Sequence, residues 1–284
     1  MTSNSQTTHS ATTRITAAGA PRSGVAGRAR RVRSLGRAEA LLLMRNPIGL
    51  FIALALPASF AVMVVNGQPN GDAGSGRGAA IVVSLTAFAL LSNVYYNLVT
   101  ALVARREELV LKRLRTGETD DAEIIAGTSL PSVAIAWGQT LVGLAAAVAW
   151  FDLAWPANPL LILAAVVLGT IVLIPIAAVS TAITRTVEMA QVTAMPVIII
   201  SMVPGLMLPL AELPGAARRV AAFLPMTRMV ELLHLGLTGT TTRGTTVGTA
   251  ASFGAAVVPL LVLGAWVVVG VMATRRWFRW EPRH

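Results

Sequence analysis

Six stretches of the chain, each at least 19 residues long, contain no Asp, Glu, Lys, Arg or His. A helix of about 20 apolar residues spans the hydrocarbon core of a bilayer. A soluble core rarely contains six such stretches, so the sequence predicts an all-α integral membrane protein with six spanning helices. The predicted spans are residues 47–65, 79–103, 130–151, 159–184, 190–210 and 252–273.

Basic residues gather at the ends of these stretches, and membrane proteins keep loops rich in Lys and Arg in the cytoplasm. Residues 1–46 hold eight arginines and one acid, and residues 275–284 hold four arginines and one acid. We therefore expect both termini in the cytoplasm and the six-helix domain, residues 47–273, in the lipid bilayer of the cell membrane. This distribution explains the net charge of +10 without nucleic acid as a partner.

The segments outside the apolar stretches differ in character. Residues 1–33 are rich in Ser, Thr, Arg and Gly and predict a disordered cytoplasmic tail rather than a transit peptide. Residues 34–46 have apolar positions at helical spacing, with Arg37 and Arg45 placed to reach lipid headgroups. This pattern predicts a helix in the plane of the interface, and a cytoplasmic extension of the first span is the alternative. Residues 274–284 form a second cytoplasmic tail.

The inner loop, residues 104–129, carries five basic residues and six acids. Glu108 and Lys112 are four positions apart in the favourable order for a helical ion pair. Asp120 and Glu123 have the spacing of a weak capping box. We therefore predict two short helices here, with a mixed charge that suits a polar protein partner better than an anionic lipid surface.

The segment between the last two spans is the exception to the charge pattern, because residues 211–251 should lie outside and yet hold four arginines. Two short amphipathic stretches within residues 211–240 are broken at Pro225, and Arg228 precedes Glu231 by three positions. This segment is too polar to cross a bilayer and too apolar for a free loop. It predicts a re-entrant pair of helices that enters the membrane from outside.

Polar residues recur along the second span. Thr86, Asn93, Asn97 and Thr100 fall on one face of an α-helix, and Tyr96 lies beside them. Such residues either line a wet route through the membrane or form hydrogen bonds between helices, and both interpretations stay open. In the fifth span, Pro204 followed by Gly205 predicts a bend, which is either a moving hinge or a static kink.

Several kinds of chemistry are absent from the whole sequence. A P-loop needs Gly-x-x-x-x-Gly-Lys-Ser/Thr, and the only lysine, Lys112, is not in that context. The three histidines form no zinc-binding pair, so we expect no catalytic residue, metal or cofactor in this chain. An ion-coupled secondary carrier usually places ionisable residues inside the bilayer, and the six spans contain none. Such a carrier is therefore a weaker alternative.

The order and spacing of these features resemble the permease subunits of ABC-2 type transporters. They are most similar to the antibiotic-export type typified by the daunorubicin-resistance membrane subunit. The resemblance rests on the Arg45-Asn46-Pro47 step, the loop pattern R-E-E-x-x-x-x-R-L-R-T-G, and the stretch from Pro209 to Gly239. It covers roughly residues 34–279 and implies the ABC-2 exporter fold.

The resemblance also implies roles for individual residues. A coupling helix in the inner loop would dock on a separate ATPase subunit through Glu107, Glu108, Leu109, Leu111, Arg113 and Leu114. The translocation pathway would include Thr86, Asn93, Tyr96, Asn97, Thr100 and Pro204. An outer gate would include Pro209, Leu213, Pro214, Pro225, Arg228 and Glu231.

The resemblance further implies partners for the chain. Two ABC ATPase subunits would bind ATP and Mg²⁺, and a second permease copy, in a homodimer or a close paralogue pair, would complete the route. The cargo would be a lipophilic small molecule such as a drug or antibiotic, or a lipid. A membrane scaffold or immunity protein without transport activity is the remaining alternative.

Overall fold

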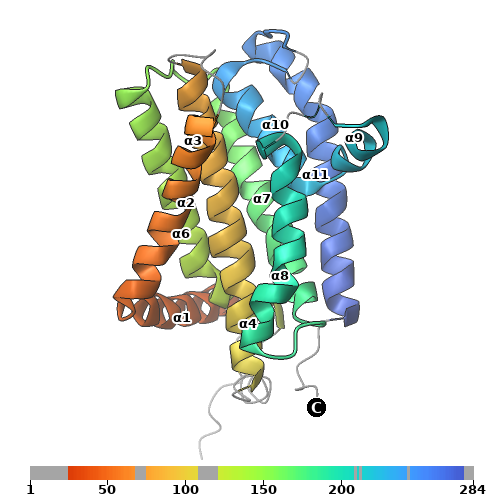
Figure 1. The fold of residues 1–284 in the computed structure, drawn as a ribbon. Helices are drawn as coiled ribbons and strands as arrows, with labels where there is room; N and C mark the ends of the chain where they lie inside the picture. The colour runs from red at the N-terminus through yellow and green to blue at the C-terminus, as the bar shows by residue number, and fades with distance from the viewer. Residues whose placement is uncertain are drawn as a thin grey trace, which may run out of the picture.

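The computed structural model is a bundle of roughly parallel helices with one helix lying across its base (Figure 1). It describes residues 25–67, 75–107, 121–207, 210, 213–241 and 244–277. These residues form helices and no strand, apart from an isolated bridge between Thr240 and Thr246. The predicted all-α membrane fold is therefore confirmed.

Five helical stretches are long and apolar enough to cross a membrane. They are α2 (Pro47–Gly67), the second span made of α3 (Ser75–Ala89), η1 (Leu90–Tyr96) and α4 (Asn97–Glu107), α6 (Asp121–Trp150), α7 (Pro159–Ser180) and α11 (Thr249–Trp277). The fifth predicted span corresponds to α8 (Val187–Met202), which is 16 residues long and continues through a π-helix, η2 (Val203–Met207).

A bent pair of helices follows η2, namely α9 (Gly215–Ala221) and α10 (Pro225–Thr238), which meet at 80°. Together they have the length and composition of either a broken span or a re-entrant loop. Leu224 is extended and Pro225 occupies the first position of α10, where a proline costs no helical hydrogen bond. The bend therefore follows from the Leu-Pro step noted in the sequence.

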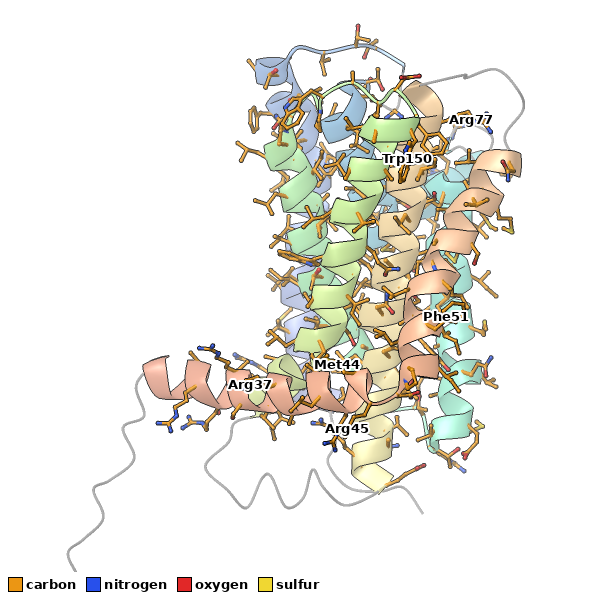
Figure 2. All side chains as sticks on the ribbon, turned by 90° about the vertical axis from the view of Figure 1, so that its left-hand side faces the viewer. Arg37, Met44, Arg45, Phe51, Arg77 and Trp150 are labelled. Atoms are coloured by element: carbon orange, nitrogen blue, oxygen red, sulfur yellow. The ribbon has the colours of Figure 1, made fainter. Side chains whose placement is uncertain are left out.

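The first helix, α1 (Val25–Met44), lies across the foot of the bundle, where Figure 2 labels Arg37 and Met44. The opposite end of the bundle carries Arg77 at the start of α3 and Trp150 at the end of α6 (Figure 2). The Asn46 side chain accepts a hydrogen bond from Gly49 N at 2.9 Å. Asn46 thus caps α2, with Pro47 at its first position, and fixes the corner between the two helices.

The predicted disorder of residues 1–33 is wrong for residues 25–33, because α1 begins at Val25. Its N-terminal half is fixed by Glu123, which accepts hydrogen bonds from Arg31 Nε at 2.8 Å and Nη2 at 3.0 Å. At the crossing of α1 and α6, a Cβ added to Gly127 would lie 2.7 Å from Leu35 Cβ, so the two helices meet at close range. These contacts join positions 92 residues apart and leave no local signal in the sequence.

The inner loop also differs from the prediction. Its expected second short helix is the start of α6, which runs without a break from Asp121 and not from residue 130. Glu123 and Ile124 are buried, so this polar segment belongs to the packed base of the bundle. The expected first short helix falls within residues 108–120, which lie outside the described residues.

The second span is the central helix of the bundle. In its most apolar stretch 78% of residues are buried, against 28% in α2, 28% in α6 and 22% in α11. The outer helices expose large apolar side chains such as Phe51, Leu141 and Leu261. Such a surface is unfavourable in water and suited to lipid, as expected of a multi-pass membrane protein.

Candidate functional site

The central helix changes its winding halfway along. Residues Leu90–Tyr96 form a π-helix, and the amide of Asn97 bonds to the carbonyl of Ser92, five residues back. A π turn adds a residue to the turn and changes which face later residues occupy, and such turns are frequent at functional sites. As a result, the predicted polar face is divided, because Thr86 and Asn93 are fully buried while Tyr96, Asn97 and Thr100 are half-buried.

Asn93 connects three helices inside the bundle. Its Nδ2 donates to Gln139 Oε1 on α6 at 2.8 Å and to the carbonyl of Ala53 on α2 at 3.3 Å. Gln139 Nε2 in turn donates to the carbonyl of Leu54 at 3.0 Å. Pro57 lies four residues after Ala53 and has no amide hydrogen, so the Ala53 carbonyl lacks its usual helical donor. For Asn93, the arrangement favours bonding between helices over contact with cargo.

The half-buried side of the central helix forms a second set of residues. The central stripe comprises Phe88, Ser92, Tyr96, Asn97 and Thr100. Phe60 of α2 stacks on Phe88 with ring centroids 4.5 Å apart, and α8 packs against α4. The central helix thus lies between α2 and α8 (Figure 1). Four of its five members carry a hydroxyl or amide group, and all five are half-buried.

Three polar atoms of the central helix are buried without a hydrogen-bond partner in the described part of the chain. They are Thr86 Oγ1, Ser92 Oγ and Asn93 Oδ1. A buried polar group without a partner costs about 1–3 kcal/mol, and Ala, Val or Leu at these positions would avoid that cost. The polar residues at Thr86 and Ser92 are therefore not explained by packing alone, whereas Asn93 also bonds to α2 and α6.

At the base of the bundle, the end of α4 contacts the turn between α7 and α8. Arg106 is 3% exposed and donates to the carbonyls of Thr181, Thr184 and Arg185. Glu107 accepts a hydrogen bond from Val187 N at 3.2 Å. The remaining predicted coupling residues lie outside the described residues, namely Glu108, Leu109, Leu111, Arg113 and Leu114.

At the opposite end, α10 packs along α7. Asn158 N donates to the Gly236 carbonyl at 2.9 Å, and the Met229 sulfur would lie 2.6 Å from a Cβ added to Gly169. Met229 and Gly236 are seven residues apart, so α10 follows α7 for roughly 10 Å. The N-terminal end of α10 therefore lies well below the outer surface of the bundle.

Arg228, one of the four arginines of this outer segment, has two hydrogen-bond partners close by. Arg228 Nη1 lies 2.6 Å from Glu231 Oε2, and its Nε donates to the Ala222 carbonyl at 2.6 Å. Trp266 Nε1 of α11 donates to the Phe223 carbonyl at 2.6 Å and holds the bend of the pair. The carboxylate compensates the charge of the guanidinium and the carbonyl accepts one of its hydrogen bonds. Such partners reduce the cost of placing an arginine within an apolar bundle.

Residues 30–237, more than half of the chain, match the family model for the ABC-2 type transporter. The chain belongs to the ABC-2 type transporter family. A search of the curated proteins finds no match. An ABC-2 permease is the membrane-spanning component of an ABC transporter, is not itself catalytic, and implies an ATPase partner.

In this ABC-2 permease, the predicted site residues occupy four places. Thr86, Asn93, Tyr96, Asn97 and Thr100 lie on the central helix, and Pro204 lies in η2. Pro225, Arg228 and Glu231 share the first turns of α10, Leu213 and Pro214 lead into α9, and Pro209 is outside the described residues. Glu107 ends α4.

Sequence reasoning missed three residues of these sites. Gln139 lies within an otherwise apolar span. Ser92 is not on the polar face predicted with a period of 3.6 residues, because that period does not include a π turn. Arg106 is one of several charged residues in the predicted inner loop. A lone glutamine in a charge-free span was the one signal that could have been used, since an amide at that depth needs a partner.

Proposed function

We propose that this ABC-2 permease is the membrane half of an ATP-driven exporter of lipophilic small molecules, such as drugs or antibiotics, or of lipids. The observation that carries the proposal is the central stripe, which is half-buried and carries neutral hydroxyl and amide groups at membrane depth. Neutral hydroxyl and amide groups can hydrogen-bond an apolar molecule that carries a few polar atoms. They offer nothing to neutralise a strongly charged cargo.

A second permease copy would complete the route. Since the stripe is only half-covered by α2 and α8, one chain leaves it with an open side, and a copy facing it would enclose a path between two central helices. We therefore propose a homodimer, or a pair with a close paralogue, with the stripe of each copy on the shared path. Oligomers with this kind of self-complementary face are commonly two-fold symmetric.

The motor would bind at the base of the bundle. The base carries α1, the end of α4 and the start of α6, and the segment between α4 and α6 is the charged inner loop (Figure 1). We propose that this base faces the cytoplasm of the cell, because the two terminal segments of the sequence, residues 1–46 and 275–284, together hold twelve arginines. Two copies of an ATPase subunit would dock there and bind ATP and Mg²⁺.

The outer segment would close the route on the far side. Helices α9 and α10 lie in the half of the bundle opposite the base (Figure 1) and bend at the Leu224-Pro225 step. The ion pair of Arg228 and Glu231 lies at that bend, so breaking or shifting it offers a way to change the position of α9. We propose these residues as an outer gate, together with Pro209, Leu213, Pro214 and Pro225.

The proposal is tested by purifying the tagged chain from its native membranes in a mild detergent and measuring what comes with it. We expect an ABC ATPase in roughly stoichiometric amount and vanadate-sensitive ATP hydrolysis in the eluate. A variant with Glu107→Arg and Glu108→Arg should lose both, whereas Arg30→Glu, on the exposed side of α1, should keep both. Recovery of the folded chain alone in several detergents would contradict the proposal.

A further inference from the structure

The Arg106 side chain is the starting point, because it is a buried cation at the cytoplasmic end of the central helix. Its guanidinium donates to the carbonyl of Thr181 at 2.8 Å, to that of Arg185 at 3.3 Å, and to that of Thr184. These carbonyls end α7 and form the turn before α8. A cation there satisfies carbonyls that have no helical donor and complements the negative end of the α7 dipole.

Glu107, the next residue along α4, caps the start of α8 with a negative charge. Glu107 Oε1 accepts a hydrogen bond from the amide of Val187, the first residue of α8. This amide has no helical acceptor, and an anion complements the positive end of a helix dipole. Two adjacent residues of α4 thus cap two neighbouring helix ends. The cation caps the C-terminal end of α7, and the anion caps the N-terminal end of α8. We call this arrangement the inner joint, formed by Arg106 and Glu107.

Arg105, the residue before Arg106, forms a hydrogen bond to a different helix. Arg105 Nη1 donates to Thr128 Oγ1 on α6 at 2.7 Å. It leaves the same helix end with the same charge, but contacts a different element. The end of α4 is therefore attached on one side to α6 and on the other side to the α7–α8 turn.

The two helices that meet at the inner joint differ in how firmly the bundle holds them. In α7, 56% of the most apolar stretch is buried. Helix α8 exposes Val192, Ile199 and Ile200 by 66%, 55% and 54% and has few buried residues. Only six residues, 181–186, lie between the end of α7 and the start of α8. A pull on this turn would therefore displace α8 more easily than α7.

We propose that the inner joint transmits the movement of the inner loop to α8. The inference rests on the proposed function, since the movement would originate in an ATPase docked at residues 108–120. Because the joint binds the start of α8, a shift of the α4 end would tilt α8 and move η2, with Pro204, which continues α8 directly. Arg106 and Glu107 would act as positioning residues and need not touch cargo or nucleotide.

The test uses the permease–ATPase complex and follows amide hydrogen exchange in residues 187–207, with ADP and with ATP plus orthovanadate. Arg106→Gln removes the guanidinium that binds the three carbonyls of the α7–α8 turn. Val187→Pro removes only the amide that Glu107 binds, and proline is well accepted at the first position of a helix. Thr186, before it, is already extended, as a residue before proline should be. Arg105→Gln is the matched control.

In the wild type and in Arg105→Gln, we expect the exchange of residues 187–207 to differ between the two nucleotide states. In Arg106→Gln and Val187→Pro, this difference should be lost, although the ATPase still co-purifies and still hydrolyses ATP. Arg106→Lys, which keeps the charge but not the three-way contact, should retain part of it. Should Arg106→Gln fail to fold, Val187→Pro and Arg106→Lys decide the matter.

Two results would overturn the inference while leaving the proposed function intact. One is a wild-type complex that hydrolyses ATP with no change in residues 187–207. The other is an unchanged nucleotide response in Val187→Pro and Arg106→Lys, with Arg106→Gln either like wild type or unfolded. If no ATPase binds the wild-type chain, the proposed function itself fails and the inference fails with it.

Discussion

The side-chain amide of Asn93 donates to the carbonyl of Ala53, which is the carbonyl that Pro57 leaves without a helical donor. The proline in α2 and the asparagine in the central helix are therefore complementary, although they are 36 positions apart in the sequence. Gln139 completes the arrangement by accepting from Asn93 and donating to Leu54. The contact fixes α2, the central helix and α6 to one another at the level of the π turn.

This relationship predicts a coupling between two substitutions. Asn93→Ala should lower the free energy of unfolding by about 1–2 kcal/mol, since hydrogen bonds between membrane helices contribute roughly that much at most. In a Pro57→Ala background the same substitution should cost less, because the amide of residue 57 can then donate to Ala53. Thermal or denaturant unfolding of the four proteins in detergent gives the coupling energy. Equal costs in both backgrounds would show that the two residues are independent.

The contact between α10 and α7 predicts a strong effect of a single methyl group. A Cβ added to Gly236 would lie 3.0 Å from two backbone atoms, the Asn158 oxygen and the Ile162 nitrogen. Backbone atoms cannot move aside as a flexible side chain can, so Gly236→Ala should cost about 1–3 kcal/mol. Gly264→Ala is the control, since a Cβ there meets nothing within 4 Å. A matching loss of thermal stability in both variants would contradict this packing.

The ion pair between α1 and α6 predicts how α1 is held. Glu123 is 5% exposed and lies 2.8 Å from Arg31 Nε and 3.7 Å from Arg28 Nε. Arg31→Glu would place two carboxylates together, so hydrogen exchange in residues 25–33 should become fast. Combining Arg31→Glu with Glu123→Arg should restore part of the protection. Arg30→Glu, on the exposed side of the same helix, should change nothing; fast exchange in that variant as well would mean that net charge, and not the pair, orders α1.

The sequence was sufficient where the physics is local. Charge-free stretches and the position of arginines predict the membrane fold, and the Leu224-Pro225 step predicts the bent pair. It was insufficient where distant residues decide. Helix α1 extends back to Val25 and α6 extends back to Asp121, both beyond their apolar stretches. The ion pair of Arg31 and Glu123 joins these two polar segments.

The candidate site shows the same limit. A helical period of 3.6 residues places Thr86 and Asn93 with Thr100, but the π turn between Leu90 and Tyr96 separates them into a buried and a half-open set. The role of Arg106 depends on carbonyls about 75 positions further along the chain. Neither the extra residue of a π turn nor such a distant contact has a signature in a local pattern.

The central claim is that the stripe on the central helix lines an ATP-driven route, and cysteine accessibility tests it most directly. The chain has no cysteine, so single variants are simple to label. Asn97→Cys and Thr100→Cys place a small thiol on the stripe, and Thr86→Cys places one at a fully buried position of the same helix.

These variants would be treated with a membrane-impermeant maleimide in the permease–ATPase complex, in nanodiscs, with and without ATP plus orthovanadate. The account predicts that Asn97→Cys and Thr100→Cys react at rates that change with nucleotide, while Thr86→Cys stays unreactive in both states. If the stripe thiols are as inert as Thr86→Cys in every state, the stripe is packing and the proposed route does not exist.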